Sequence, residues 1–521
     1  MTLPRPSHRL LAALCACALS LPASAAALGA APVTTIAKGT GYASLLRLTQ
    51  ASGARAKGSL MLAFEQPGIV GVPIYTRAHG QHWTLLDHVV DGRHADDSRW
   101  QLRWQPNLTQ LRDKADSLPA GTLLLAANAT GNTASGRLNA EDLQLYTSRD
   151  GGVHWHYRSS IVEGHGNPSS ADNQGVWEPY IVQLDDGRLV AYYSSEQHKR
   201  QGFNQVLAHK VSSDGGRSWG KETIDVAVAG GVQRPGMATV VHLPDGRYVM
   251  AYEDIDHPHN GQVHLKFSRD GLHWGPATRP GIAVRTASGA WPSACPVIRW
   301  FPVGGKEGTL VISSERAGGG GDEDGHALYW NNAGGRGPWW EVPAPVAKLT
   351  GNIHAGWTQA LMLRGDGRFL HITSSADPSD PGNVALNVMQ SAVGRLDFSR
   401  YEAEDAARRQ ASAIGDSHAS NGRRVRLAAG DGARLRFPVH VDAAGVRRVS
   451  VVYADLGLPG TPTLSVNGAP QPAGKVSKRK DGRYQVSWQA PMLAGFNRLD
   501  VHGGEHVLDV DYLELGSAGT K

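Results

Sequence analysis

Two glutamates lie at the ends of strand-like segments in this chain of 521 residues. Glu178 stands between Trp177 and Pro179, directly before an alternating apolar segment, and Glu253 ends a similar segment further along. Cleavage of a glycosidic bond needs such a pair: a protonated carboxyl group for the leaving oxygen and an ionised carboxylate that attacks or activates water. Because a buried carboxylate is costly unless it is paired, both positions are candidates for an active site.

The elements that would position these glutamates repeat along the first 400 residues. Each repeat has an apolar strand, a turn with glycine and a second apolar strand. The second strands align without gaps at residues 58–65, 121–128, 187–194, 246–253, 308–315 and 367–374. Six such units, none able to bury its faces alone, predict a six-bladed β-propeller from residue 35 to residue 398.

Two sets of aligned positions predict which side chains face the central axis. Aligning the first strands on a proline groups four residues: Gln105, Glu178, Arg234 and Trp291. Aligning the second strands groups their last residues: Glu65, Asn128, Ser194, Glu253, Glu315 and Ser374. Both sets are expected at one mouth of the tunnel. Glu65 and Glu315 stay open as alternatives to Glu253, and Glu315 could equally pair with Arg316, which follows it.

A second motif recurs in predicted turns. Residues 148–155 and 212–219 follow the pattern Ser-x-Asp-x-Gly-x-x-Trp, and residues 268–274 carry a copy one residue shorter. The Ser and Asp side chains can bond the amides of the turn, the glycine can supply a positive φ, and the tryptophan can fill the gap between strands. The motif resembles the Asp-box, or BNR repeat, of the sialidase superfamily, which implies a sialidase-like propeller and a structural role for the motif.

The segments around the two glutamates resemble glycoside hydrolase family 93 over roughly residues 35 to 398. The resemblance rests on Trp177-Glu178-Pro179 and on residues 234–253, RPGMATVVHLPDGRYVMAYE. It implies a secreted exo-arabinanase that releases arabinobiose from α-1,5-linked arabinan with retention, with Glu178 as nucleophile and Glu253 as general acid and base. The predicted substrate-binding residues are Arg234, which would donate to hydroxyls, Trp291, which would stack on a ring, and Gln105, Glu315 and Glu65.

The residues leave other interpretations open. Glu178 could pair with Arg234 across the interface between blades, and Glu253 could lie in a solvated loop. A sialidase would need three arginines around the substrate carboxylate, for which Arg77, Arg234 and Arg316 are candidates, but the sequence has no Arg-Ile-Pro motif. A propeller that only binds glycan or protein is the remaining alternative.

The pattern changes after residue 398. Residues 399–516 contain no Asp-box, and their length and alternating apolar residues predict a β-sandwich. The segments YEAED and DVDYLEL, which open and close it, resemble carbohydrate-binding modules of families 35 and 6. That resemblance implies a structural calcium ion on Glu402, Glu404 and Asp511, whose oxygen ligands suit a hard cation. The alternative is surface carboxylates on two strand ends. Few contacts are expected between this module and the propeller.

The N-terminus predicts export. Basic residues, an apolar run over residues 10–21 and Ala23-Ser24-Ala25 form a secretory signal over residues 1–25. Cys15 and Cys17 lie inside it, so a mature chain would keep only Cys295, although the signal weakly resembles a lipoprotein acylation site.

The remaining sequence narrows the partners. No later apolar run reaches the roughly 18 residues that a membrane helix requires. The formal charge of +5 is scattered along the chain, which argues against a nucleic-acid surface. We therefore expect a secreted monomer, periplasmic or extracellular, that acts on an oligosaccharide or polysaccharide. We expect no organic cofactor and neither a nucleic-acid nor a membrane partner.

Overall fold

The computed structural model describes residues 32–78, 82–166, 173–321, 325–457 and 460–518. The predicted signal peptide and its two cysteines therefore lie outside the described residues. The described chain is built of strands, apart from short 3₁₀ helices at η2 (Lys199–Gln201), η3 (Val384–Leu386) and η4 (Ala403–Asp405). This confirms the predicted all-β fold class. Within the described residues, no helix has the length and apolar character to cross a membrane.

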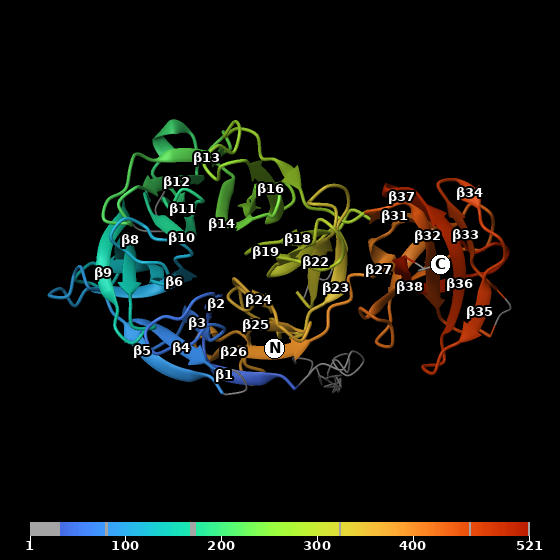
Figure 1. Cartoon of the computed structure of the whole chain (residues 1–521), viewed down its shortest axis with the longest axis horizontal. Coiled ribbons are helices and arrows are strands. Elements are labelled where there is room, and N and C mark those ends of the chain that lie inside the picture. The colour runs from blue at the N-terminus through green and yellow to red at the C-terminus, as the bar shows by residue number, and fades with distance from the viewer. Residues whose placement is uncertain (1–31, 79–81, 167–172, 322–324, 458–459, 519–521) are drawn as a thin grey trace, which may run out of the picture.

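Six sheets of the described chain follow one another in a ring around a common axis, one for each predicted repeat (Figure 1). The first three sheets comprise β2 (Gly41–Arg47), β3 (Leu60–Glu65), β4 (Val72–Arg77) and β5 (Thr84–Val89); β6 (Trp100–Gln110), β7 (Leu123–Asn132), β8 (Leu138–Ser148) and β9 (His156–His165); and β10 (Val176–Gln183), β11 (Leu189–Ser195), β12 (Val206–Ser212) and β13 (Thr223–Ala227).

The other three sheets complete the ring. They comprise β14 (Arg234–His242), β15 (Tyr248–Ile255) and β16 (Gln262–Ser268) with the short strands β17 (Ile282–Ala283), β18 (Trp291–Ser293) and β21 (Arg316–Gly318); β19 (Val297–Phe301), β20 (Thr309–Ser313), β22 (Ala327–Asn331) and β23 (Trp340–Pro343); and β24 (Ala360–Leu363), β25 (Phe369–Ser375), β26 (Val388–Gly394) and β1 (Thr34–Lys38). Because β1 pairs with β26, the start of the described chain closes the ring.

The antiparallel register assigns the strand ends to two opposite faces of the ring. Glu65, at the end of β3, pairs with Gly41, whereas Leu60, at its start, pairs with Arg47. The second strands of the other blades run the same way, so their last residues meet on the face of Glu65. The second strands themselves are almost entirely buried, as for β11 and β15. This agrees with the apolar segments predicted at residues 187–194 and 246–253.

The Ser-x-Asp turns lie on the opposite face and have the predicted structural role. Ser148 Oγ accepts a hydrogen bond from the amide of Gly152 at 2.9 Å. Asp150 Oδ1 accepts two more amide hydrogen bonds from the following residues. The turns at residues 212–219 and 268–274 repeat this arrangement.

The innermost strand of each blade has a left-handed residue within it or just before it, toward the face of Glu65, and in the first four blades this residue lies in a bulge. At or just before these strands six residues have left-handed backbone angles, with φ between 48° and 59°: Tyr42, Gln105, Glu178, Met237, Cys295 and Thr358. The strand register shifts at these residues in the first four blades. A bulge of this kind re-aims side chains and backbone amides. A non-glycine residue at positive φ is held there at a cost of about 1–3 kcal/mol, which the surrounding structure must offset.

The C-terminal region forms two further sheets. One contains β29 (Ala411–Gly415), β30 (Arg423–Leu427), β38 (Leu508–Ala518), β32 (Gly445–Tyr453), β36 (Tyr484–Met492) and β35 (Lys475–Lys478), with β27 (Arg400–Glu402) paired to β38; the other contains β28 (Ala407–Arg409), β31 (Arg434–Val441), β37 (Gly495–His502), β33 (Thr463–Val466) and β34 (Ala469–Pro470). Every second residue of β31 is buried, as expected of a sheet with one face on a core.

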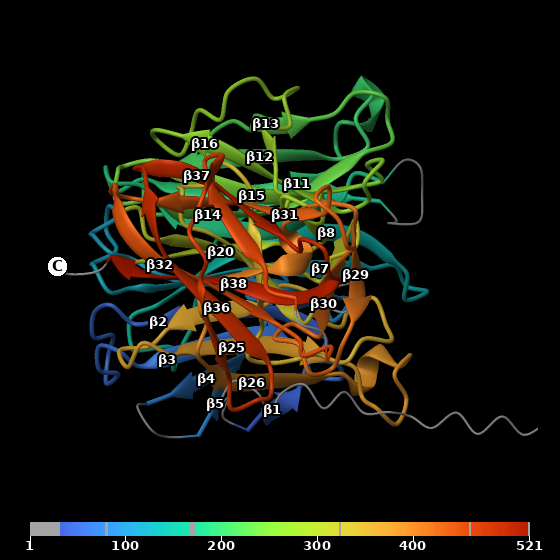
Figure 2. The same cartoon turned by 90° about the vertical axis from the view of Figure 1, so that its right-hand side faces the viewer.

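The C-terminal sheets lie beside β23 of the ring (Figure 1), and Figure 2 shows them in front of the ring. One buried apolar cluster contains residues of both regions. Its contact is aromatic: the ring of Tyr401 lies 5.2 Å from that of Trp330 and 4.9 Å from that of Trp340, and Phe437 stacks on Trp340 at 6.0 Å. The expectation that few contacts join the two regions is therefore wrong, because large side chains from β22 and β23 complete the core at the junction.

Candidate active site

The predicted carboxylates come together at the ring axis. A cavity of about 450 Å³ is lined by Glu65, Gln105, Glu178, Arg234, Glu253 and Glu315, together with Tyr42, Met237 and Cys295. A smaller cavity of about 50 Å³ continues below it between the innermost strands. Six of the seven catalytic or substrate-binding residues predicted from the sequence thus share one cavity, and Trp291 does not line it.

The bulges hold the cavity's polar groups from one blade to the next. The amide of Gln105 donates to Glu65 Oε1 at 3.0 Å, and the amide of Glu178 donates to Gln105 Oε1 at 3.0 Å. The amide of Met237 donates to Glu178 Oε2 at 3.1 Å, and the amide of Cys295 donates to Glu253 Oε2 at 2.6 Å. These four amides therefore each fix an acceptor of the preceding blade, which gives the strained backbone at these residues a role in the cavity.

The register places Met237, rather than Arg234, at the position of Glu178. In β14 Gly236 pairs with Glu253, just as the residue before Glu178 pairs with the end of its own second strand. The predicted alignment on proline was wrong for this blade, because the bulged residue Met237 is not followed by proline.

Trp291 was aligned wrongly for the same reason. It lies on β18, which pairs with β21 in the sheet of the fourth blade, whereas the innermost strand of the fifth blade, β19, begins at Val297. Cys295 is the left-handed residue of the fifth blade. The Trp291 ring instead lies 4.7 Å from the ring of His259, and the Arg285 guanidinium lies 5.2 Å from it.

Glu178 is partly buried and has donors on one carboxylate oxygen. Ser194 Oγ donates to Glu178 Oε2 at 2.5 Å, beside the bond from the Met237 amide. Burial raises the pKa of Glu178, while these donors and the nearby Arg234 charge lower it. Arg234 pairs with Glu196 at 2.9 Å, so the alternative of a Glu178–Arg234 ion pair is wrong.

Glu253 is more deeply buried than Glu178, with 7% of its surface exposed, so it does not lie in a solvated loop. Burial, and then the negative charge of Glu178, raise the pKa of Glu253 to about 8. The Cys295 amide is its hydrogen-bond donor in the described chain. At neutral pH Glu253 is therefore protonated. The ionised form of Glu178, its neighbour, is stabilised by hydrogen bonds from Ser194 and Met237.

Glu65 and Glu315 are the other carboxyl groups of the cavity. Burial raises the pKa of Glu65 to about 7, and the Gln105 amide opposes that shift. Glu315 lies 3.5 Å from Arg316 Nε and accepts a hydrogen bond from Trp357 Nε1 at 3.1 Å, so its pairing with Arg316 is present. Burial also raises the pKa of Glu315. Both carboxyl groups are tied into the wall of the cavity.

Aromatic side chains that the sequence analysis did not select line the same cavity. They are Trp104, Trp177 and Trp357. The rings of Trp104 and Trp177 lie 6.4 Å apart, and His354 stacks on Trp357 at 4.0 Å. Each tryptophan directly precedes a bulged residue in the sequence, a signal that could have found them. Their indole faces provide the stacking surface that had been expected from Trp291.

The predicted calcium ligands lie together near the junction. Ser420 Oγ lies 2.5 Å from Glu402 Oε2 and 3.1 Å from Asp511 Oδ1, so its hydroxyl links the two carboxyl groups. One buried oxygen on each of Glu402 and Glu404 has no hydrogen-bond partner, which suits a cation. However, Arg483 contacts Asp511, and no group of three or more acidic, His or Cys side chains with metal-binding geometry occurs in the described ranges. The calcium site stays a prediction.

Comparisons with known proteins agree with the propeller. The model of the BNR repeat-like domain matches residues 140–287. The structure of an α-L-arabinanase of Penicillium chrysogenum, complexed with arabinobiose, is similar with a TM-score of 0.59 and 26% identity. A family 93 α-L-arabinofuranosidase of Fusarium graminearum is similar with a TM-score of 0.58 and 24% identity. Each match covers 70% of this chain and 98% of the other.

The propeller resembles those of glycoside hydrolase family 93. This confirms the sialidase-like resemblance predicted from the sequence, and at 24% identity the likeness to the Fusarium enzyme concerns the fold alone. A comparison with curated protein sequences finds no match. The similarity of the C-terminal sheets to carbohydrate-binding modules stays a prediction.

Proposed function

We propose that this chain is a secreted glycoside hydrolase that cleaves α-1,5-linked arabinan from a chain end with retention of configuration. The observation that carries the proposal is the pair Glu178 and Glu253, which line one cavity with different hydrogen-bond donors. The similar Penicillium structure, an α-L-arabinanase complexed with arabinobiose, supports the substrate class.

In the proposed mechanism Glu178 is the nucleophile. Its attack on the anomeric carbon breaks the bond to the leaving oxygen and forms a glycosyl ester. The Ser194 hydroxyl and the Met237 amide hold Glu178 Oε2, which fixes the carboxylate and favours its ionised form.

Glu253 is the proposed general acid. Because its pKa is about 8, it carries a proton at neutral pH and can give that proton to the leaving oxygen. As a carboxylate it then accepts a proton from the water that hydrolyses the ester, which returns both groups to their starting state. The charge of Glu178 repels a second charge on Glu253 and so keeps Glu253 protonated. The raised pKa of Glu253 therefore supports its role as the acid beside an ionised nucleophile.

The wall of the cavity would orient the sugar. Trp104, Trp177 and Trp357 line the cavity with aromatic rings, and the Arg234 side chain, 37% exposed, keeps donors beyond its bonds to Glu196 and Gln205. Such a wall suits a neutral sugar, which binds through ring stacking and hydroxyl contacts.

The arrangement of the arginines counts against the sialidase alternative. Arg234 and Arg316 line the cavity, but Arg77 ends β4 and pairs in the sheet with Leu60, at the strand ends on the opposite face. A substrate carboxylate in the cavity would therefore meet two of the three candidate arginines, one of them bonded to Glu196 and the other to Glu315.

An assay with three substrates tests the proposal. The chain should hydrolyse α-1,5-linked arabino-oligosaccharides and linear arabinan and leave a sialyl-oligosaccharide intact. NMR spectra taken early in the reaction should show the first-formed product with the substrate's α configuration. Release of sialic acid, a β product or binding without hydrolysis would each overturn the corresponding part of the proposal.

A further inference from the structure

A second cavity lies on the other face of the ring, where the first and sixth blades meet. Its volume is about 260 Å³, and it is lined by residues that include Arg47, Leu60, Arg77, Met362, Arg364 and Leu370. Leu60 and Arg47 stand at the strand ends opposite to Glu65. The cavity is therefore distinct from the candidate active site and spans the seam at which the ring closes.

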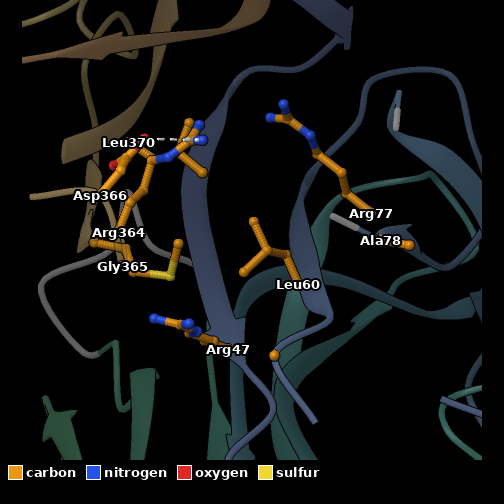
Figure 3. Close-up of a pocket in the computed structure, with 10 residues that line it drawn as sticks. Arg47, Leu60, Arg77, Ala78, Arg364, Gly365, Asp366 and Leu370 are labelled. Carbon is orange, nitrogen blue, oxygen red and sulfur yellow. Dashed lines mark ion pairs between the residues drawn. The ribbon is translucent and has the colours of Figure 1, made fainter. Parts of the chain in front are cut away.

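Three guanidinium groups from two blades surround this cavity. Figure 3 shows Arg47 and Arg77 on either side of Leu60, with Arg364 approaching from the sixth blade. Asp366 is the acidic residue among those lining the cavity, and it lies 3.3 Å from Arg364 and 2.7 Å from Arg368. Arg47 is exposed, and its guanidinium makes no hydrogen bond or ion pair within the described part of the chain. The positive charge of the cavity thus exceeds its negative charge.

The guanidinium groups around this cavity act on one another. Burial, and then repulsion by Arg364, lower the pKa of Arg77. Like charges held together across a seam destabilise it unless an anion lies between them. An anion that contacted arginines of both blades would therefore also stabilise the closed ring.

The rest of the lining is apolar. Leu60 and Met362 are partly exposed, and Leu370 is buried behind them. A small anion such as sulfate would use the guanidinium groups and leave this surface uncovered. A sugar ring that carries a carboxylate would use both, because its C–H face can cover aliphatic side chains while its carboxylate accepts paired hydrogen bonds from arginine.

We propose that this cavity binds an acidic sugar, with the carboxylate of a uronic acid residue among Arg47, Arg77 and Arg364 and one face of the ring on Leu60 and Met362. Through this site the protein would bind an acidic polysaccharide on the face of the ring opposite to the cavity of Glu178. The inference does not depend on the proposed catalytic function.

Calorimetric titration of the full chain tests the proposal with three probes: galacturonate, galactose as its neutral counterpart and inorganic phosphate. Galacturonate should bind at one site, more weakly as salt is added, and should raise the melting temperature. Galactose should not bind at this site. Binding of phosphate without galacturonate would overturn the assignment to an acidic sugar, and binding of neither anion would overturn the site itself.

Two variants locate the binding. Arg47→Gln removes a guanidinium that has no partner in the described chain, and it should weaken galacturonate binding about tenfold, with Arg47→Gln/Arg364→Gln abolishing it. Arg188→Gln is the matched control, since it removes one charge on the same face outside the cavity. Hydrolysis of arabino-oligosaccharides should be unchanged in all three. Equal galacturonate affinity in the double variant and the Arg188 control would overturn the proposal.

Discussion

Two clusters of buried carboxyl groups can be compared in this molecule: one lies at the ring axis and the other at the junction with the C-terminal sheets. At the axis, Glu65, Glu178, Glu253 and Glu315 line a cavity of about 450 Å³. At the junction, Glu341 on β23 faces Glu404 and Asp405 on η4. Burial raises the pKa of carboxyl groups in both regions, yet we assign chemistry to only one of them.

The two regions differ in what surrounds the carboxyl groups. At the axis each is open to a space large enough for a sugar, and bulged amides of the neighbouring blade fix Glu65, Glu178 and Glu253. At the junction Asn421 Nδ2 bridges Glu341 and Glu404, and the two carboxyl groups have 0% and 3% of their surface exposed. Burial and a raised pKa therefore do not by themselves mark an active site; access to a cavity separates the two cases.

The largest expected effect comes from removing the junction. A chain ended after Arg400 loses Tyr401 and Phe437 from the faces of Trp330 and Trp340. Since each large side chain contributes about 1.5–3 kcal/mol on burial, we expect the truncated propeller to aggregate rather than fold. Solubility and a thermal unfolding scan check this expectation.

A point variant separates lost packing from lost chain. Tyr401→Ala should destabilise the full chain by about 3–5 kcal/mol, whereas Val476→Ala, at a position 44% exposed, should change stability by less than about 0.5 kcal/mol. A soluble truncated chain that unfolds in one cooperative transition would show that the propeller is independent of the junction.

The second prediction contrasts one glutamate from each region. Glu178→Gln removes the proposed attacking charge but keeps the shape, so hydrolysis should fall by at least about a thousandfold while the melting temperature stays within a few degrees. Glu404→Gln should leave kcat/KM unchanged. Kinetics on an arabino-oligosaccharide and thermal scans of both variants provide the comparison, and equal loss of activity in the two would erase the distinction between the regions.

The same contrast explains what sequence could predict. The sequence pattern predicted all six second strands. Each is an apolar segment after a turn with glycine, because a strand buried between neighbouring sheets needs continuous apolar residues. Their last residues correctly include Glu253 and Glu65. The first strands were misaligned in two blades. The left-handed residues there are Met237 and Cys295, and neither residue type marks such a backbone in a sequence. The junction was missed because nothing in residues 330–340 shows that their tryptophans face another region.

The third prediction concerns pH. The folded-state pKa of Glu253 is raised to about 8, so the proton needed by a general acid is present below that value and lost above it. The kcat/KM of the wild-type chain should therefore fall tenfold per unit above pH 8, and it should fall again in acid, where Glu178 takes up a proton and can no longer attack. Glu253→Gln should remove the alkaline limb and spare substrates with good leaving groups most. A basic limb near pH 5 would contradict the assignment of Glu253 as the acid.

The smallest expected effect is that of calcium on the junction. Glu402 and Glu404 each have a buried oxygen without a hydrogen-bond partner, and a cation between them and Asp511 would neutralise charges that burial disfavours. A ligand that binds only the folded chain stabilises it by about 2.7 kcal/mol at a hundred times its dissociation constant. Millimolar calcium should thus raise the melting temperature by a few degrees, and a chelator should reverse the change. Glu402→Gln should abolish the response, whereas Glu178→Gln should keep it, since the cavity of Glu178 lies apart from the junction. If the melting temperature of the wild-type chain does not respond to calcium or chelator, the predicted site is absent, and the Arg483 contact is then what balances Asp511.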